Sequence, residues 1–186
     1  LLAGLPERDR ALERTRLLGS PMAVGLADRL FRLEAENPGE VLERLLEYPI
    51  EGEFELRSDE GTRRVHVRGT ADRIDLLADG TLRVIDYKAG RAPKPTRAIQ
   101  LPVYGACAEQ LLDGRHGRTW KVRKAGYVAF GDRRTFVSIA GRGDLPSALA
   151  MGQGRFVKAV DGIERGEFPP RPDEKFLCLT CHYSTV

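Results

Sequence analysis

Within residues 69–88 of this 186-residue sequence, Asp72, Asp86 and Lys88 form a pattern that suits chemistry on a phosphate ester. Two apolar-rich runs flank an Asp-Gly pair, which is typical of a tight β-hairpin. Asp86 and Lys88 end the second run two positions apart, so on a strand they project from one face while Tyr87 points away. Asp72 lies in the first run, and folding the hairpin can bring it alongside that pair.

Two carboxylates and an ammonium group at one place suit metal-assisted hydrolysis of a phosphodiester. Carboxylate oxygens are hard ligands that hold Mg²⁺ through one or two side chains. The ion lowers the pKa of a bound water and offsets charge on the phosphate. A neighbouring lysine can position that water or stabilise the developing negative charge. An Asp and a Lys two apart are also common on a solvated strand face, so these residues alone leave both interpretations open.

The elements that must position these side chains can be read from hydrophobic spacing. Residues 7–33 predict two helices separated at Gly19-Ser20-Pro21, and residues 41–46 predict a third, short helix. A meander of three strands follows, and then a crossover helix, two more strands and a last helix, over residues 50–57, 65–77, 82–88, 97–112, 125–130, 135–139 and 145–165. This order predicts an α/β fold with a mixed central sheet flanked by helices. Ligand sites of such sheets gather near strand ends.

Composition predicts one soluble domain. The chain is 41% hydrophobic and 31% charged, with net charge +3. We expect helical cover over residues 1–48, a catalytic core over 49–140, and a C-terminal helix with a cysteine-containing tail over 141–186. No apolar run is long enough to span a membrane, and the first twenty residues lack a signal-peptide pattern. Three cysteines form no disulfide framework, which favours a reducing cytoplasmic compartment.

Gln100 and Tyr104 lie four positions apart in the predicted crossover helix, so they share a face. An amide and a phenol directed at a charged cleft could hold a nucleic-acid strand by hydrogen bonds to phosphate and by stacking on a base. The alternative is that Tyr104 is partly buried and Gln100 solvent-exposed. Arg91, Lys94 and Arg97 flank the candidate site and could contact phosphates, although such basic runs are usually solvated faces.

Three motifs together resemble the RecB-like branch of the PD-(D/E)XK nuclease superfamily, which includes the nuclease domains of bacterial helicase–nucleases and related exonucleases. They read Gly69-x-x-Asp72-Arg73-x-Asp75, Asp86-Tyr87-Lys88-x-Gly90 and Gln100-x-x-x-Tyr104. The resemblance implies that Asp72 and Asp86 bind Mg²⁺ or Mn²⁺ with help from the backbone carbonyl of Tyr87. It implies that Lys88 is catalytic, and that Gln100 and Tyr104 engage the DNA strand.

The function that this resemblance implies is a metal-dependent deoxyribonuclease, an exonuclease acting in DNA end processing and recombinational repair. A helicase domain or subunit is the implied partner. Two alternatives stay open. One is a catalytically idle DNA-binding or scaffolding module of a helicase–nuclease complex. The other is a structure-specific endonuclease.

The sequence departs from the resembled family upstream of the first strand. Family members place a metal-binding histidine on a helix there, and His66, His116 and His182 all lie elsewhere. Glu53, near the start of the first strand, could approach the site, but it also fits a solvent-facing position of an alternating strand.

A Cys-x₂-Cys motif, Cys178 and Cys181, resembles two of the four cysteines that bind a [4Fe–4S] cluster in many RecB-like nucleases. On its own, the pair could equally be half of a zinc site or have no metal role. We expect the sequence to be a fragment of a longer protein, since it begins with Leu1 and ends at Val186 just after this motif. Cys107, within the predicted crossover helix, fits a small buried apolar residue.

Overall fold

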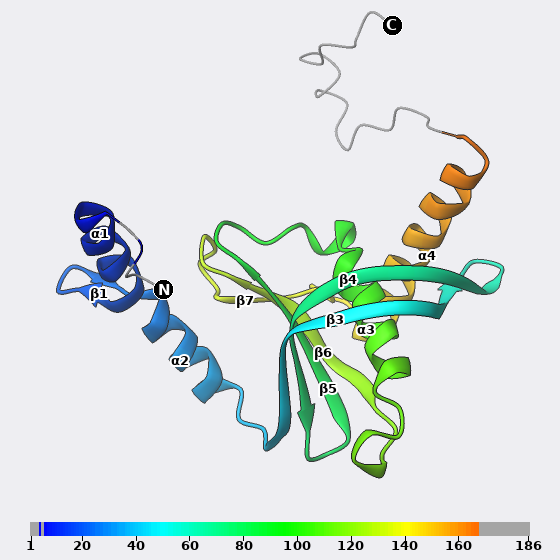
Figure 1. Ribbon diagram of the computed structural model, residues 1–186, viewed down its shortest axis with the longest axis horizontal. Helices are drawn as coiled ribbons and strands as arrows, with labels where there is room; N and C mark the ends of the chain where they lie inside the picture. Colours follow the sequence, from blue (N-terminus) through cyan, green and yellow to red (C-terminus); the bar gives the residue numbers. More distant parts are fainter. Residues whose placement is uncertain (1–3, 5, 168–186) are drawn as a thin grey trace, which may run out of the picture.

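The computed structural model describes residue 4 and residues 6–167 of the chain. The helices and strands follow in the order shown in Figure 1: α1 Glu7–Leu18, β1 Gly19–Ser20, β2 Ala23–Val24, α2 Leu26–Glu36, β3 Val41–Ser58, β4 Gly61–Leu77, β5 Thr81–Lys88, α3 Gln100–Leu111, β6 Lys121–Ala129, β7 Phe136–Ser138 and α4 Leu145–Glu164. Two short 3₁₀ turns, Pro95–Arg97 and Arg115–Gly117, flank α3.

The central sheet has five strands in the order β3-β4-β5-β6-β7. The pair β5–β6 is parallel, because the connection through α3 crosses over, and the other neighbouring pairs are antiparallel. The predicted mixed sheet and the predicted meander of the first three strands are therefore confirmed. The turn between β4 and β5 lies at the expected Asp-Gly pair, where Gly80 has φ +81° and Asp79 Oδ1 accepts hydrogen bonds from Thr81.

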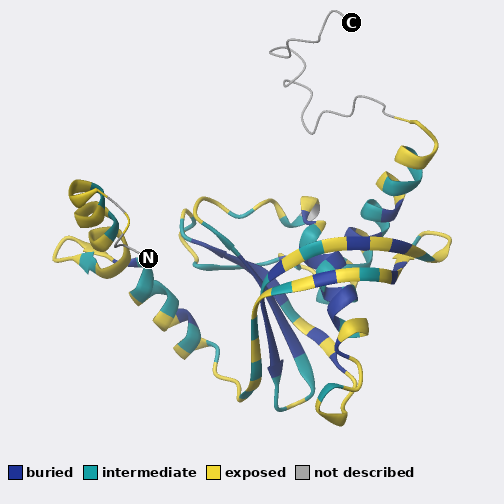
Figure 2. Cartoon of the chain, in the orientation of Figure 1, coloured by how far each residue is buried: buried dark blue, intermediate teal, exposed yellow. Residues whose placement is uncertain are grey.

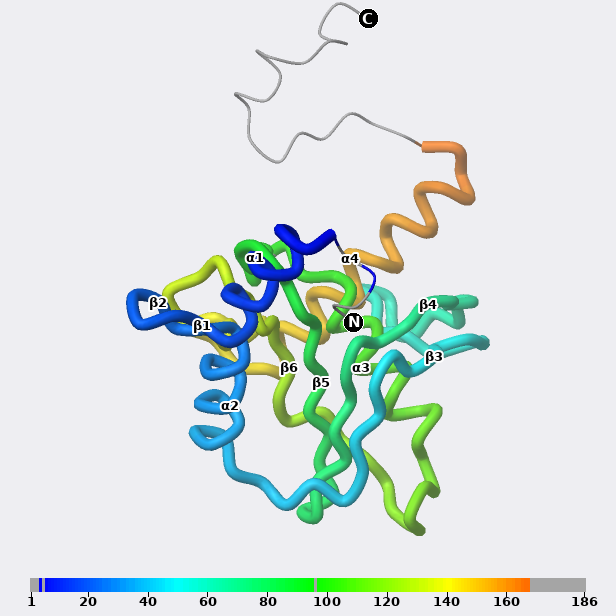
Figure 3. Tube along the Cα trace, turned by 60° about the vertical axis from the view of Figure 1, so that its left-hand side comes forward, coloured from blue at the N-terminus to red at the C-terminus, as the bar shows by residue number. Residues whose placement is uncertain are grey.

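The central strands β5 and β6 are buried on both faces, and each face packs against a different helix layer (Figures 2 and 3). Leu82 and Val84 of β5 belong to the larger core, which α3 and α4 cover. Ile85 points the other way and packs with Val128 of β6 and Leu33 of α2. Burial of each such side chain stabilises the fold by roughly 1.5–3 kcal/mol. The alternation along β5 therefore decides which layer each residue faces.

The predicted short helix at residues 41–46 is wrong, because this segment is the first part of strand β3. Val41 pairs with Leu77, and Leu45 pairs with Ile74, so β4 provides a hydrogen-bonding partner along this segment. Cross-strand pairing outweighs a helical spacing of leucines that is only six residues long. The β3–β4 hairpin extends well beyond the other strands and lies over α3 and α4 (Figure 1).

The N-terminal elements also differ from the prediction in detail. Gly19–Ser20 and Ala23–Val24 form a small antiparallel hairpin between the two helices, and α2 begins only at Leu26. Helix α1 has no buried residue, so of the two helices only α2 contributes a buried side chain to the sheet's cover. Within the described part of the chain, none of the helices combines the length and apolar character needed to cross a bilayer.

Candidate active site

Strand β5 carries Asp86 and Lys88 toward the layer of α3. Both continue the face of Leu82 and Val84, so the apolar side chains form the base on which the charged pair lies. Lys88 Nζ is 2.6 Å from Asp86 Oδ2, which is an ion pair between a buried carboxylate and a lysine whose side chain is 35% exposed. The pair therefore lies at the boundary between the buried sheet and the solvent.

Asp72 lies beside this pair at the end of the β4–β5 ladder. The paired residues stop at Arg73 and Ile85. The next step of the same register would oppose Asp72 and Asp86, and directly opposed residues of antiparallel strands share a face. In place of a backbone bond, Asp72 Oδ2 accepts a hydrogen bond of 2.8 Å from the N–H of Tyr87. The Asp72 carboxylate therefore fixes the backbone between Asp86 and Lys88.

Opposing effects act on the pKa of the Asp86 carboxyl, and those that raise it prevail. Burial raises the pKa of its carboxyl above the ordinary value, and the nearby charge of Asp72 raises it further. Lys88 and a hydrogen bond from the side chain of Gln100 oppose this shift without cancelling it. Asp86 Oδ2 is buried and has no aligned hydrogen-bond donor in the described part of the chain, its contact being the ion pair with Lys88.

The first residue of α3 reaches the acids, and the next turn packs on β4. Gln100 is half-buried, and its side-chain amide lies near enough to Asp86 to lower the pKa of that carboxyl, so it is not simply a solvent-exposed residue. Tyr104 is half-buried, as the alternative interpretation held, and its ring lies against Gly69. A Cβ atom at residue 69 would lie 2.2 Å from the Tyr104 hydroxyl oxygen. Gly69 therefore makes room for Tyr104, which links the first and third sequence motifs in space.

Tyr127 was not singled out by the sequence and lies under the charged pair. It is paired with Asp86 across the parallel β5–β6 register and is buried. Its ring centroid is 5.9 Å from Lys88 Nζ, a cation–π distance. Burial and the charge of Asp86 raise the pKa of Tyr127 to about 12, which keeps the phenol neutral. Only the register of a non-local strand pair places it here, so no local sequence signal could reveal it.

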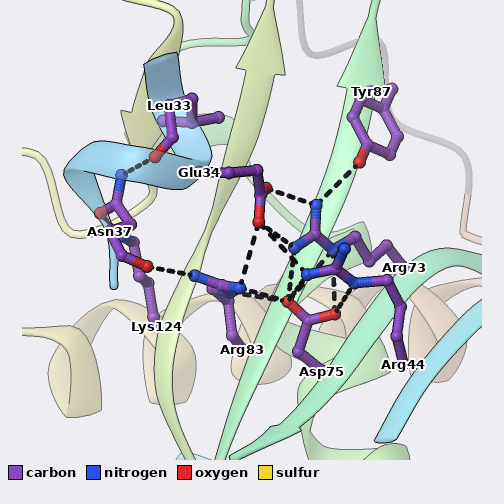
Figure 4. A network of polar contacts seen from close by, with 9 residues as sticks. All are labelled: Leu33, Glu34, Asn37, Arg44, Arg73, Asp75, Arg83, Tyr87 and Lys124. Atoms are coloured by element: carbon purple, nitrogen blue, oxygen red, sulfur yellow. Dashed lines mark hydrogen bonds and ion pairs between the residues drawn. The ribbon is translucent and has the colours of Figure 1, made fainter. Parts of the chain in front are cut away.

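Asp75, the last residue of the first motif, lies on the opposite face of the sheet from the candidate site. Its carboxylate accepts hydrogen bonds from Arg44, Arg73 and Arg83 at 2.5–3.3 Å. Glu34 of α2 binds Arg73 from the other side at 2.7 Å, and Figure 4 shows the whole group. We call these five residues the arginine network. It holds α2 on the sheet and stands apart from Asp86 and Lys88.

Other candidate ligands do not join the site. Glu53 is exposed and pairs with His66 at 3.3 Å on the β3–β4 hairpin. His116 pairs with Glu43 at 2.8 Å. Cys107 is a free, buried cysteine, as predicted. Cys178, Cys181 and His182 lie outside the described residues.

The donor set suits a hard divalent cation held by few protein ligands. Residues 4 and 6–167 contain no group of three or more His, Cys, Asp and Glu side chains placed to hold a metal. Asp72 and Asp86 supply two carboxylates, and the Asp86 oxygen without an aligned donor leaves a lone pair for a cation. Mg²⁺ is commonly held by one or two carboxylates while it keeps several waters. The residues present therefore fit such an ion.

Comparison with known proteins gives one family. Residues 5–186 match the family model described as the PD-(D/E)XK nuclease superfamily. The match spans nearly the whole chain, and it includes the β3–β4–β5 meander and the α3 crossover that position the acids. Proteins of this superfamily are in general nucleases that hydrolyse phosphodiesters, typically with Mg²⁺ or Mn²⁺. No curated protein matches the chain.

Proposed function

The chain belongs to the PD-(D/E)XK nuclease superfamily, and from this premise we propose that it is a metal-dependent deoxyribonuclease of the RecB-like branch. One observation carries the proposal: Asp72, Asp86 and Lys88 meet at the end of one hairpin, with Asp86 buried. Burying a carboxylate without saturating its oxygens is costly, so a fold that does so at a strand end marks a functional site.

We assign Asp72 and Asp86 as the cation ligands, with the backbone carbonyl of Tyr87 as a further oxygen. Within a strand residue, N–H and C=O point to the same side. The Tyr87 N–H binds Asp72, so its carbonyl is directed toward the same strand. When bound, the cation supplies a water of lowered pKa and offsets negative charge on the phosphate.

Lys88 is assigned to position the attacking water and to stabilise the negative charge that develops on the phosphate. Its ammonium lies 5.9 Å from the centre of the Tyr127 ring, and its side chain is 35% exposed, so it is accessible to an incoming anion. Gln100 is assigned two roles. Its side-chain amide orients the Asp86 carboxylate, and its position at the start of α3 lets it contact the DNA strand. Tyr104 presents its hydroxyl one turn further along the same helix.

The finer features rest on the resemblance to RecB-like nucleases. These are exonuclease rather than endonuclease action, a role in DNA end processing and recombinational repair, and a helicase domain or subunit as partner. The [4Fe–4S] cluster at Cys178 and Cys181 stays a prediction for residues that the structure does not describe. Because such a cluster needs four cysteine ligands and this motif supplies two, we expect it in the intact protein, where iron content measured on protein prepared without oxygen would test it.

The test of the proposed function is cleavage of labelled linear and covalently closed circular DNA by the 186-residue chain with Mn²⁺ or Mg²⁺. We expect linear DNA to be degraded from its ends, the circle to stay intact, and chelation to stop the reaction. Lys88→Ala should cut the rate by at least about 10²-fold, the usual effect of removing one stabilising donor. Lys121→Ala is the matched control, because that lysine pairs with Glu109 away from the acids.

Three outcomes would contradict parts of the proposal. Cleavage of the closed circle would favour the structure-specific endonuclease. DNA binding with no cleavage under either cation would favour the idle binding module. A Lys88→Ala variant as fast as Lys121→Ala would remove Lys88 from the reaction.

A further inference from the structure

Two loops at the carboxyl ends of β5 and β6 are joined by hydrogen bonds beside the candidate active site. The first is the segment after β5, residues 89–92, and the second is the turn between β6 and β7, residues 130–135. The N–H of Phe130 donates to the carbonyl of Lys88 at 3.0 Å, and the N–H of Gly131 donates to the carbonyl of Gly90 at 2.8 Å. The N–H of Ala92 donates to Asp132 Oδ2 at 2.8 Å. The second loop thus continues the β5–β6 pairing past the catalytic strand.

The approach of the two loops is close enough to require glycine. A Cβ atom at residue 131 would lie 2.6 Å from the carbonyl carbon of Gly90 and 2.9 Å from the nitrogen of Arg91. These are backbone atoms and cannot rotate away. Any larger side chain at residue 131 must therefore push the loops apart.

Helix α2 braces the turn from the other layer. Arg29 donates to the carbonyls of Phe130 at 2.5 Å and of Asp132 at 2.9 Å, and to Thr135 Oγ1 at 3.4 Å. Its guanidinium also lies 5.7 Å from the centre of the Phe130 ring. A guanidinium that satisfies two carbonyls of one turn holds that turn in a single shape. The turn is fixed from both sides.

This braced pair of loops presents cations outward. Arg91, Arg133 and Arg134 are exposed, and no hydrogen bond or ion pair to another described residue engages their side chains. The one carboxylate within residues 89–92 and 130–135 is that of Asp132, and it is bonded to Ala92. Arg91 follows Lys88 by three residues, and the turn starts directly after Ala129, which pairs with Lys88. Both loops that carry the three arginines therefore begin next to the candidate active site.

We propose that Arg91, Arg133 and Arg134 form a phosphate-binding platform that receives the nucleic-acid backbone as it enters the site, with Arg29, Gly131 and Asp132 as its positioning residues. This inference rests on the proposed nuclease function for the identity of the ligand. Rigid placement matters because an arginine on a loop held in one conformation loses less freedom when it binds a phosphate. The positioning residues and the three arginines of the platform can therefore be tested by separate substitutions.

The platform is tested by DNA binding in EDTA, measured by fluorescence anisotropy over a range of salt concentrations. Each phosphate contact contributes about 0.9 to the slope of log affinity against log salt for duplex DNA, and about 0.7 for a single strand. Replacing Arg91, Arg133 and Arg134 together by alanine should therefore reduce the slope by about 2–3. Arg123→Ala is the control, because Arg123 is exposed near the opposite end of β6. A triple variant with the slope of Arg123→Ala would overturn the proposal.

The brace is tested by Asp132→Ala in the same assay. Removing a negative charge from a basic surface would by itself strengthen binding to DNA. Loss of the bond to Ala92 should instead loosen the platform, so we expect weaker binding, and Gly131→Ala should weaken it as well. Tighter binding by Asp132→Ala would show that the brace does not position the arginines.

The outcomes separate the platform from the nuclease proposal. DNA binding that depends on the three arginines in a chain that never cleaves would retain the platform and reject the nuclease. If the triple variant cleaved DNA with Mn²⁺ at the wild-type KM and with the wild-type salt dependence, the nuclease would be retained and the platform rejected.

Discussion

Asp75 and Asp86 are two buried carboxylates on neighbouring strands that face opposite layers, and the protein treats them in opposite ways. Burial would raise the pKa of Asp75, but hydrogen bonds from Arg73, Arg44 and Arg83 outweigh it and lower the pKa to about 2. Asp86 is nearly as buried, yet its pKa is raised, because burial exceeds the help from Lys88 and Gln100. Equal burial therefore does not mean equal charge stabilisation.

The difference separates a structural carboxylate from a chemical one. The arginine network leaves Asp75 with every oxygen bonded, and it ties α2 and β3 to β4 and β5 (Figure 4). Asp86 keeps an oxygen without an aligned donor at the end of the sheet. A carboxylate whose oxygens all accept hydrogen bonds is poorly placed to bind a ligand, whereas one with an oxygen that accepts none can bind a cation. The comparison predicts opposite responses to the same substitution.

The largest expected effect is on stability, from Asp75→Asn. This change leaves three guanidiniums facing Glu34 alone, and breaking a buried ion pair typically costs about 3–5 kcal/mol. Chemical denaturation should show a correspondingly lower free energy of unfolding. Asp113→Asn, an exposed residue after α3, is the control and should change little. A loss no larger than that of the control would mean that the network does not stabilise the fold.

The next effect is on activity, from Asp86→Asn. Removing a proposed cation ligand should lower the cleavage rate by about 10²–10³-fold. Stability should hold or rise, because the raised pKa shows that the folded protein disfavours the ionised form. Lys88 loses its partner but is partly exposed, so water can solvate it. Thermal unfolding checks this part, and a destabilisation as large as that of Asp75→Asn would erase the distinction between the two carboxylates.

A smaller effect is the acid dependence of stability. The folded-state pKa of Asp75 is depressed to about 2, so its contribution is fully present above the unfolded-state pKa of about 3.9 and is lost as pH falls toward 2. The pKa difference corresponds to about 2.5 kcal/mol. The gap in unfolding free energy between the wild type and Asp75→Asn should narrow by about 2 kcal/mol between pH 5 and pH 2. A gap that is constant with pH would contradict the assignment.

Local sequence patterns predicted most of the sheet and much of the site's placement. The Asp-Gly turn, the alternation of Leu82 and Val84 with Ile85, and the two-residue spacing of Asp86 and Lys88 are short-range features, and the structure has all of them as expected. The prediction for residues 41–46 failed because their leucine spacing also fits a helix, and strand partners 27 to 36 positions away outweighed that preference.

Residues brought together from distant parts of the chain escaped prediction. Tyr127 reaches the site through the parallel register of β5 and β6, and Arg29 reaches the β6–β7 turn from α2. Both contacts depend on how whole elements pack, which no window of the sequence contains. Gly69 was recognised as part of a sequence motif. Why a glycine is needed there, to leave room for the Tyr104 ring, became clear only from the packing of α3 on β4.

The sequence alone determined that a hairpin would present an acid and a lysine on one face, because strand parity is a property of consecutive residues. It also determined that Asp72 and Asp75, three positions apart, would lie on opposite faces. Only the tertiary structure decided which of these faces would be saturated by arginines and which would keep a buried carboxylate oxygen without an aligned donor. That choice depends on Glu34 and Arg44 arriving from other elements, since the stability of a buried charge is set by the partners that packing brings to it.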